Sequence, residues 1–209
     1  MEDLDHFPLD WGVRTFTLPG QSESGDLHVV KTSAAKAMVG VVDGLGHGDA
    51  AAAAAKVAVR ALLEYADEPI ISLLNRCHEN LRATRGAVMN VAFLNSRENT
   101  LTWLGVGNVQ GVLYRAGGLE KPAHVFLLPC KGVVGDKFER PMASLLAISP
   151  GDTLIFSTDG VHSDFALSAD LALSLSASPQ SIADRIIARH VKGTDDALAL
   201  VARYRRATS

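Results

Sequence analysis

Three predicted strands that follow one another almost directly constrain the fold of this sequence most strongly. They cover residues 85–94, 100–106 and 109–115, with the turns 95–99 and 107–108 between them. Neighbouring parallel strands need a crossover of about a dozen residues or more, so strands joined by such short turns are expected to be antiparallel. The pattern therefore argues against a doubly wound parallel sheet, which needs a helix between nearly every pair of strands.

The remaining periodicity predicts further strands and three helices. The strands are expected at residues 11–18, 26–32, 37–43, 142–148, 152–159 and 197–204. The helices are expected at residues 49–65, 69–81 and 178–190. Six alanines at 50–55 favour the first helix and would let its backbone lie close to a sheet. Ser178 suits the cap of the last helix, with Pro179 at its first position.

These elements predict the α+β class, with helices that cover antiparallel sheets. The 209 residues show no internal repeat and no long linker, so we expect one domain over residues 1–209. Trp11 and Trp103 are expected in the core, and Cys77 is expected to be buried on its helix.

Composition excludes several classes of protein. The net charge is −3 and no basic run is interleaved with aromatic residues, which argues against a nucleic-acid partner. The only two cysteines, Cys77 and Cys130, form no CxxC pair, so neither a disulfide scaffold nor a zinc site is expected. The acidic N-terminus lacks the apolar segment of a signal peptide, and no apolar run is long enough to span a membrane. We therefore expect a cytoplasmic protein without a membrane partner.

Aspartates at the ends of predicted strands carry the strongest chemical signal. Asp43 and Asp159 each end an apolar strand and precede a glycine, Asp195 and Asp196 precede the last strand, and Asp26 begins another. Carboxylates gathered at one edge of a core repel one another and lose hydration, and a divalent cation would remove that conflict. Oxygen donors of this kind suit Mg²⁺ or Mn²⁺. Two such ions could share Asp43 and activate a water molecule for attack on phosphorus.

The segment 41–55 has a second interpretation, as a strand, a glycine-rich turn and a helix that bind a nucleotide. It misses the GxGxxG spacing, because Asp49 stands where the third glycine is required. An aspartate there would lie close to the pyrophosphate, and the chain contains no GxxxxGK[ST] motif. The metal site is the better supported of the two interpretations.

Several motifs, in order along the chain, resemble the metal-dependent protein serine/threonine phosphatases of type 2C (the PPM family). They are VVDGLGHG at 41–48, FSTDG at 156–160 and TDDALALV at 194–201. The resemblance is to the bacterial SpoIIE-like branch. Three further motifs are similar to those of its compact RsbX-like group, the stressosome feedback phosphatases: SGD at 24–26, RGAV at 85–88 and GVGNV at 105–109.

The resemblance implies a four-layer α-β-β-α sandwich with two antiparallel sheets. It implies that Asp43 bridges two Mn²⁺ or Mg²⁺ ions, that the Gly44 carbonyl joins one of them, and that Asp159 and Asp195 bind the other. Asp26 matches an early acidic position that acts on the metal directly or through water. Asp196 would not bind a metal ion itself but would hold these ligands in position.

The chain departs from the family pattern at three positions. Arg14 lies twelve residues before Asp26, which does not match the phosphate-binding arginine of eukaryotic relatives. The family's histidine follows the Asp–Gly pair directly, whereas here His47 comes two residues later. Ser163 stands where many bacterial relatives have an acidic ligand for a third ion. Arg85 is a further residue that could meet phosphate, and Gly107–Asn108 is predicted as a hairpin turn near the cleft.

By resemblance, the expected activity is hydrolysis of phosphoserine or phosphothreonine on a stressosome protein with a STAS domain. A phosphorylated anti-anti-sigma factor is the alternative substrate. A non-catalytic phosphoprotein-binding scaffold is an alternative of a different class, which intact Asp43, Asp159 and Asp195 disfavour.

Overall fold

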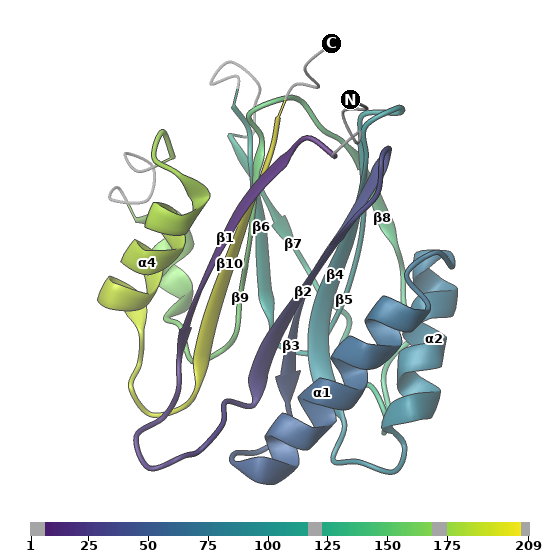
Figure 1. Cartoon of the computed structure of the whole chain (residues 1–209), viewed down its shortest axis with the longest axis vertical. Coiled ribbons are helices and arrows are strands. Elements are labelled where there is room, and N and C mark those ends of the chain that lie inside the picture. The colour runs from purple at the N-terminus through teal and green to yellow at the C-terminus, as the bar shows by residue number, and fades with distance from the viewer. Residues whose placement is uncertain (1–6, 117–122, 169–174, 206–209) are drawn as a thin grey trace, which may run out of the picture.

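Two antiparallel sheets that face each other form the centre of the computed structural model (Figure 1). The structure describes residues 7–116, 123–168 and 175–205. Sheet I has the order β1-β10-β9-β6-β7 and sheet II the order β2-β3-β4-β5-β8, and all paired strands are antiparallel. The prediction of antiparallel strands, rather than a doubly wound parallel sheet, is therefore confirmed.

The strands of each sheet come from distant parts of the chain. Those of sheet I are β1 (Leu9–Phe16), β6 (Gln110–Tyr114), β7 (His124–Leu127), β9 (Thr153–Ser157) and β10 (Ala197–Tyr204). Those of sheet II are β2 (Asp26–Thr32), β3 (Lys36–Gly44), β4 (Ala87–Asn95), β5 (Thr100–Val106) and β8 (Ser144–Ala147).

Helices cover the outer face of each sheet and complete the four layers (Figure 1). Helices α1 (Asp49–Glu64) and α2 (Ile70–Leu81) pack on sheet II. Helix α4 (Pro179–His190) and the short 3₁₀ helix η1 (Ser163–Leu167) pack on sheet I. The Ser178 hydroxyl accepts a hydrogen bond from the Ser181 backbone N–H, which confirms the predicted cap. The α-β-β-α sandwich expected from the sequence is the observed fold.

Alternation along β10 explains why this strand is apolar throughout. Leu198 and Leu200 enter the core between the two sheets, whereas Ala199 and Val201 lie under α4. Successive side chains of a strand point to opposite faces, so a strand with both faces covered needs apolar residues at every position. The sequence pattern of residues 197–204 thus reflects a central strand of a covered sheet.

The alanines of α1 let the helix lie very close to β3, as the sequence predicts. Seven residues of α1 are buried, six of them alanines. A Cβ atom built on Gly44 would lie 2.1 Å from the Ala51 carbonyl oxygen. Only glycine therefore fits at the end of β3, directly after Asp43.

Two short turns connect the sheets and are not hairpins. Gly107 and Asn108 join β5 of sheet II to β6 of sheet I, so the predicted hairpin there is wrong. The turn 149–151 likewise joins β8 to β9 of the other sheet. Gly107 has a φ of +94°, a conformation that glycine adopts readily and that redirects the chain within two residues.

Other differences from the sequence prediction are local. Strand β7 and η1 were not predicted, and β8 is shorter than residues 142–148. Trp103 and Cys77 are buried as expected, but Trp11 is 45% exposed, so its predicted place in the core is wrong. Trp11 lies on the edge strand β1, where its ring contacts that of His28 with a centroid separation of 5.7 Å.

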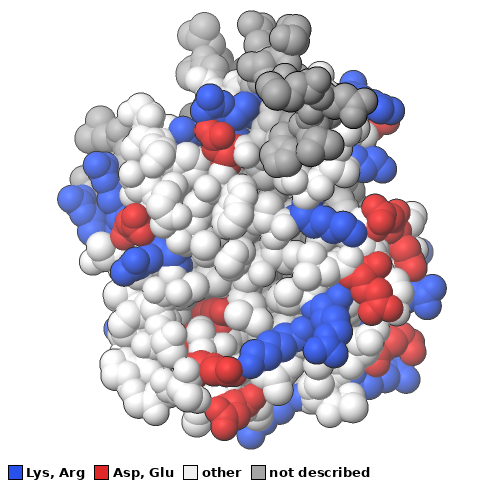
Figure 2. Space-filling view, viewed as in Figure 1, with Lys and Arg blue, Asp and Glu red and all other residues white. Residues whose placement is uncertain are grey.

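Charged side chains of both signs lie on the face that Figure 2 shows. On the α1 and α2 side of this face acidic and basic residues are interspersed, and its middle is mostly uncharged.

No helix within residues 7–116, 123–168 and 175–205 has both the length and the apolar character needed to cross a bilayer.

We expect Phe156→Ala to destabilise the protein strongly, because Phe156 is fully buried between the sheets. Loss of a buried phenylalanine side chain costs about 3–5 kcal/mol in the free energy of unfolding. Urea denaturation followed by tryptophan fluorescence measures this change. Leu145→Ala is the control, since Leu145 is 68% exposed, and its effect is expected to stay within about 0.5 kcal/mol. Equal effects of the two substitutions would contradict the assignment of this core.

Candidate metal centre

Asp26 and Asp43 lie opposite each other at one end of sheet II. They are paired across the antiparallel strands β2 and β3. Asp26 is only 4% exposed, and its Oδ2 accepts a 2.6 Å hydrogen bond from the Thr158 hydroxyl. The same hydroxyl oxygen accepts a bond from the Leu198 backbone N–H at 2.8 Å. A residue of sheet I therefore holds a carboxylate of sheet II in place.

Asp159 and Asp195 reach the same place from sheet I. Asp159 follows β9 and Asp195 lies just before β10, and both side chains are exposed. The Asn108 side-chain amide donates to Asp159 Oδ2 at 2.8 Å. A Cβ atom on Gly160 would lie 1.9 Å from the Asp196 carbonyl oxygen, so glycine is required directly after Asp159.

Asp196 ties the loop before β2 to this end of the molecule. Its Oδ1 accepts a bond from the Leu18 N–H at 2.8 Å, and its Oδ2 accepts one from the Gly25 N–H at 2.7 Å. The side chain is 4% exposed. Because both oxygens are occupied by backbone donors, Asp196 positions the residues around Asp26, which agrees with its expected supporting role.

Burial and mutual repulsion perturb the two carboxyl groups of sheet II. Burial, followed by the charges of Asp196, Asp159 and Asp195, raises the pKa of Asp26 to about 7, although the Thr158 hydrogen bond opposes that rise. Burial, followed by the charge of Asp26 and of the same three aspartates, raises the pKa of Asp43 to about 8. Five carboxylates therefore lie close enough to repel one another.

The donor set of this cluster fits a hard divalent cation. Carboxylate and carbonyl oxygens are the ligands that Mg²⁺ and Mn²⁺ prefer, and a cation would relieve the repulsion that raises the two pKa values. Within the described part of the chain, no three His, Cys, Asp or Glu side chains already form a complete metal-binding group. The cluster is thus a set of converging oxygen donors rather than a finished coordination shell.

A cleft of about 490 Å³ opens over the exposed side of the cluster. Asp43, Asp159 and Asp195 lie in its wall, together with Asn108 and His47. The convergence at one edge that the sequence predicts for Asp43 and Asp159 is therefore observed. The Gly107–Asn108 segment also lies in the cleft, although it is no hairpin turn.

Three other residues singled out from the sequence have different places. Arg14 points to α4, where its Nε lies 4.0 Å from Asp184 Oδ1. Arg85 extends its guanidinium over Gly46, where a Cβ atom would lie 2.6 Å from Arg85 Nη1. Ser163 begins η1 and does not line the cleft.

Sequence reasoning did not single out Thr158 and Lys131, which the structure places at the site. Thr158 precedes Asp159 within the motif FSTDG, so its place beside the cluster could have been inferred from that motif. Lys131 lines the cleft from the segment between β7 and β8, which carries no periodic signal. Only the three-dimensional path of that segment brings Lys131 to the aspartates.

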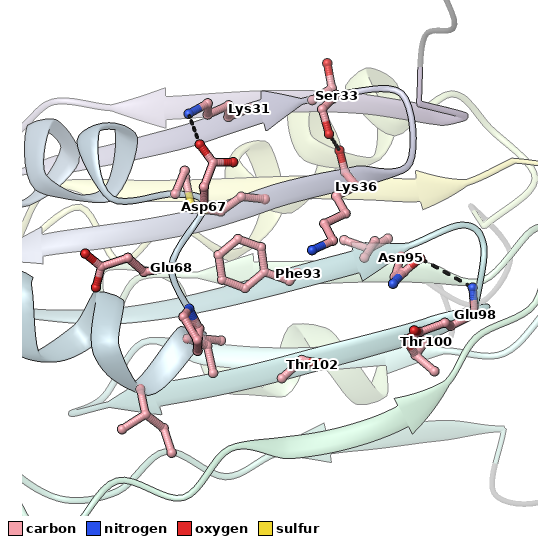
Figure 3. Close-up of a pocket in the computed structure, with 17 residues that line it drawn as sticks. Lys31, Ser33, Lys36, Asp67, Glu68, Phe93, Asn95, Glu98, Thr100 and Thr102 are labelled. Atoms are coloured by element: carbon pink, nitrogen blue, oxygen red, sulfur yellow. Dashed lines mark hydrogen bonds and ion pairs between the residues drawn. The ribbon is translucent and has the colours of Figure 1, made fainter.

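A second cavity, of about 510 Å³, lies at the other end of sheet II (Figure 3). Phe93 stands in its middle, and Lys31 Nζ lies 3.8 Å from Asp67 Oδ2 at its side. Two lysines and three acidic residues line this cavity, and none of the three carboxylates is buried: Lys31, Lys36, Asp67, Glu68 and Glu98. Its chemistry is that of an ordinary surface hollow, so the cleft over Asp43 is the better candidate for catalysis.

Comparison with known proteins gives concordant matches. A model of the family described as stage II sporulation protein E (SpoIIE) matches residues 33–205. The phosphoserine phosphatase RsbX of Bacillus subtilis (strain 168) is 28% identical over 144 residues, which cover 68% of this chain and 70% of RsbX.

Solved structures share the fold over nearly the whole chain. A chain from work on the bacterial stressosome, a modular system adapted to control secondary messenger signalling, matches with a TM-score of 0.85 and 24% identity, over 93% of this chain and 99% of that one. RsbX in complex with magnesium matches with a TM-score of 0.81 and 23% identity, over 97% of each chain.

We expect the metal-free protein to lose stability as the pH rises from about 4 to about 8, and to lose no more from Asp26 and Asp43 above that range. The folded-state pKa values of Asp26 and Asp43, about 7 and about 8, exceed the ordinary value of 3.8. Between these values the folded state therefore holds more protons than the unfolded state. The stability present below pH 3.8 falls throughout this interval, and the fall ends once the pH has passed through about 7 for Asp26 and about 8 for Asp43. Urea denaturation in EDTA at several pH values measures the free energy of unfolding.

Asp43→Asn is the matched variant for this experiment, because asparagine keeps the shape of the side chain and does not titrate. We expect its stability to fall less over the same pH range. An equal fall in wild type and variant would show that Asp43 is not one of the perturbed groups.

Proposed function

This chain belongs to the SpoIIE family, and we propose that it is a divalent-metal-dependent phosphatase of phosphoserine or phosphothreonine on a protein. The observation that carries the proposal is the convergence of five aspartates from both sheets at one end of the molecule. Three of them line one cleft, and two of the five have raised pKa values. Such a cluster is stable in its charged form only with cations. The magnesium bound by the similar RsbX structure supports a divalent ion.

We propose that Asp43 bridges two ions, Mn²⁺ or Mg²⁺, with the Gly44 carbonyl on one of them. Asp159 and Asp195 would bind the other, and Asp26 would act directly or through water. The absence of an acidic side chain at Ser163 argues against a third ion.

When bound, these ions would supply charge neutralisation and a water molecule activated for in-line attack on phosphorus. The residues of the chain prepare the site. Thr158 holds Asp26 and thereby joins the two sheets beneath the cleft. Asn108 fixes one oxygen of Asp159, and Asp196 holds the loop that leads to Asp26. Rigid supports of this kind keep ligands in register and are needed for tight metal binding.

We propose a stressosome protein with a STAS domain as the substrate. The similarity to RsbX, a phosphoserine phosphatase, and to a chain from the stressosome work supports this choice. A phosphorylated anti-anti-sigma factor is the alternative. Release of phosphate from the two phosphoproteins, measured side by side, distinguishes these substrates.

Two other functions fit the site less well. A non-catalytic phosphoprotein scaffold would not need the carboxylates of Asp43, Asp159 and Asp195, which are all present in the cleft. A nucleotide-binding loop would place Asp49 beside a pyrophosphate. We also propose that residues 1–209 act as one phosphatase domain, consistent with a family match over residues 33–205.

We expect phosphate release from a phosphorylated STAS-domain protein to require Mn²⁺ or Mg²⁺ and to fall about 100-fold or more in Asp43→Asn. The substitution weakens the ligand that the two ions would share, and loss of metal-activated water removes several kcal/mol of transition-state stabilisation. Malachite green detection of phosphate, with and without EDTA, measures both effects.

Asp67→Asn is the control, since this side chain is 97% exposed and lies far from the cleft. It should keep wild-type activity. If the wild type releases no phosphate from either protein, its activity on para-nitrophenyl phosphate is measured next. Hydrolysis of that ester would show that the reaction is right and only the proposed substrate is wrong. Inactivity on that ester as well would reject the proposed function.

A further inference from the structure

Lys131 is the one lysine or arginine among the described residues that line the cleft. Lys131 lines the same cavity as Asp43, Asp159 and Asp195. Its amine makes no hydrogen bond or ion pair with any described residue, whereas Arg14 is paired with Asp184 and Lys192 Nζ donates to the Asp159 carbonyl. Lys131 is therefore available to an anionic ligand.

The backbone around Lys131 is held on both sides. The Cys130 N–H donates to the Gly105 carbonyl at 2.9 Å, and the Gly107 N–H donates to the Cys130 carbonyl at 2.8 Å. The Lys131 carbonyl accepts a bond from the Glu139 N–H at 2.9 Å. This fixed path presents the lysine to the cleft and lowers the entropy that binding would otherwise cost.

A second hollow, of about 300 Å³, adjoins the cleft. Asn108 and Asp159 lie in the walls of both, so the two hollows adjoin at these residues. Its apolar side includes Phe126 and Leu128, which are 39% and 80% exposed. Exposed apolar side chains beside a polar cleft are typical of a surface that contacts a partner.

Lys131 and Leu128 are three residues apart on one segment, the strap Leu128–Lys131. We propose that this strap binds the phosphoprotein substrate. The Lys131 amine binds the phosphate of the phosphorylated residue in the cleft, and Leu128 with Phe126 binds an apolar side chain next to that residue in the adjoining hollow. The proposal rests on the proposed phosphatase function. It specifies the substrate as an extended segment in which an apolar residue stands next to the phosphorylated one.

The charged end and the apolar end of the strap both fit one ligand, a phosphorylated segment of a protein. A phosphate monoester carries a charge of about −1.5 to −2 at pH 7, which an ammonium group matches. The aspartates would repel this anion unless cations neutralise them, and Lys131 adds a positive charge to the wall of the same cleft. An apolar side chain in the hollow would remove Leu128 from water.

Steady-state kinetics with Mn²⁺ and two phosphopeptides test the strap. One peptide has leucine at the positions next to the phosphoserine, and the other has glycine there. We expect Lys131→Met to raise KM about 10-fold to 100-fold on both peptides, the effect of losing one charge-assisted hydrogen bond, and Lys131→Arg to restore most of it. Lys137→Met, an exposed lysine on the same segment outside the cleft, is the matched control.

The apolar end of the strap is tested by specificity. Wild type should prefer the leucine peptide about 5-fold to 10-fold in kcat/KM, and Leu128→Ser should remove that preference. Leu145→Ser makes the same substitution at an exposed position on sheet II, and this variant should keep the preference for the leucine peptide. No preference in the wild type, or equal effects of Lys131→Met and Lys137→Met, would overturn the proposal.

Binding of a fluorescein-labelled phosphopeptide separates this proposal from the proposed function. Fluorescence anisotropy needs no turnover, so it reports on the strap even when no phosphate is released. Weaker binding by Lys131→Met in a protein without activity would support the strap and reject the phosphatase. Turnover with unchanged binding by Lys131→Met would support the phosphatase and reject the strap.

Discussion

Repulsion among aspartates that two sheets bring to one edge is the constraint on which the rest of the structure depends. Asp26 and Asp43 come from sheet II, and Asp159, Asp195 and Asp196 come from the strand ends of sheet I. Their proximity raises the pKa of two of them and costs stability unless cations are bound. A fold that keeps such a cluster must hold it in place against this repulsion, and the proposed divalent cations would remove the repulsion.

Close packing supplies the rigidity. Gly44 and Gly160 each follow a cluster aspartate, and each lies where a Cβ atom would collide with a backbone carbonyl. Alanines of α1 allow the approach at Gly44, and the Thr158 hydroxyl connects Asp26 to the backbone of β10. The sheets, the helix and the cluster therefore position one another, and a small change at either glycine would move an aspartate of the cluster.

Much of this could be predicted from local sequence, and the exceptions have a common cause. The alternation of β10, the alanines of α1 and the Asp–Gly strand ends carry their information within a few residues, and the resemblance to the type 2C phosphatases agrees with the family match. The turn at Gly107–Asn108 was misread because a two-residue turn predicts a hairpin when the sheet of each strand is unknown. Trp11 was placed in the core because the sequence does not show that β1 lies at a sheet edge. Lys131 lies on an aperiodic segment whose path is set by hydrogen bonds to Gly105 in β5 and to Gly107 just after it, and such long-range contacts leave no local sequence pattern.

Direct measurement of cation binding tests the central claim. Isothermal titration calorimetry with Mn²⁺ should show binding to the wild type with a stoichiometry near two ions per chain, and much weaker binding to Asp43→Asn. Such a result would establish the aspartate cluster as the metal centre, whatever the phosphoprotein substrate is. Absence of Mn²⁺ and Mg²⁺ binding to the wild type, or equal binding by Asp43→Asn, would contradict the account.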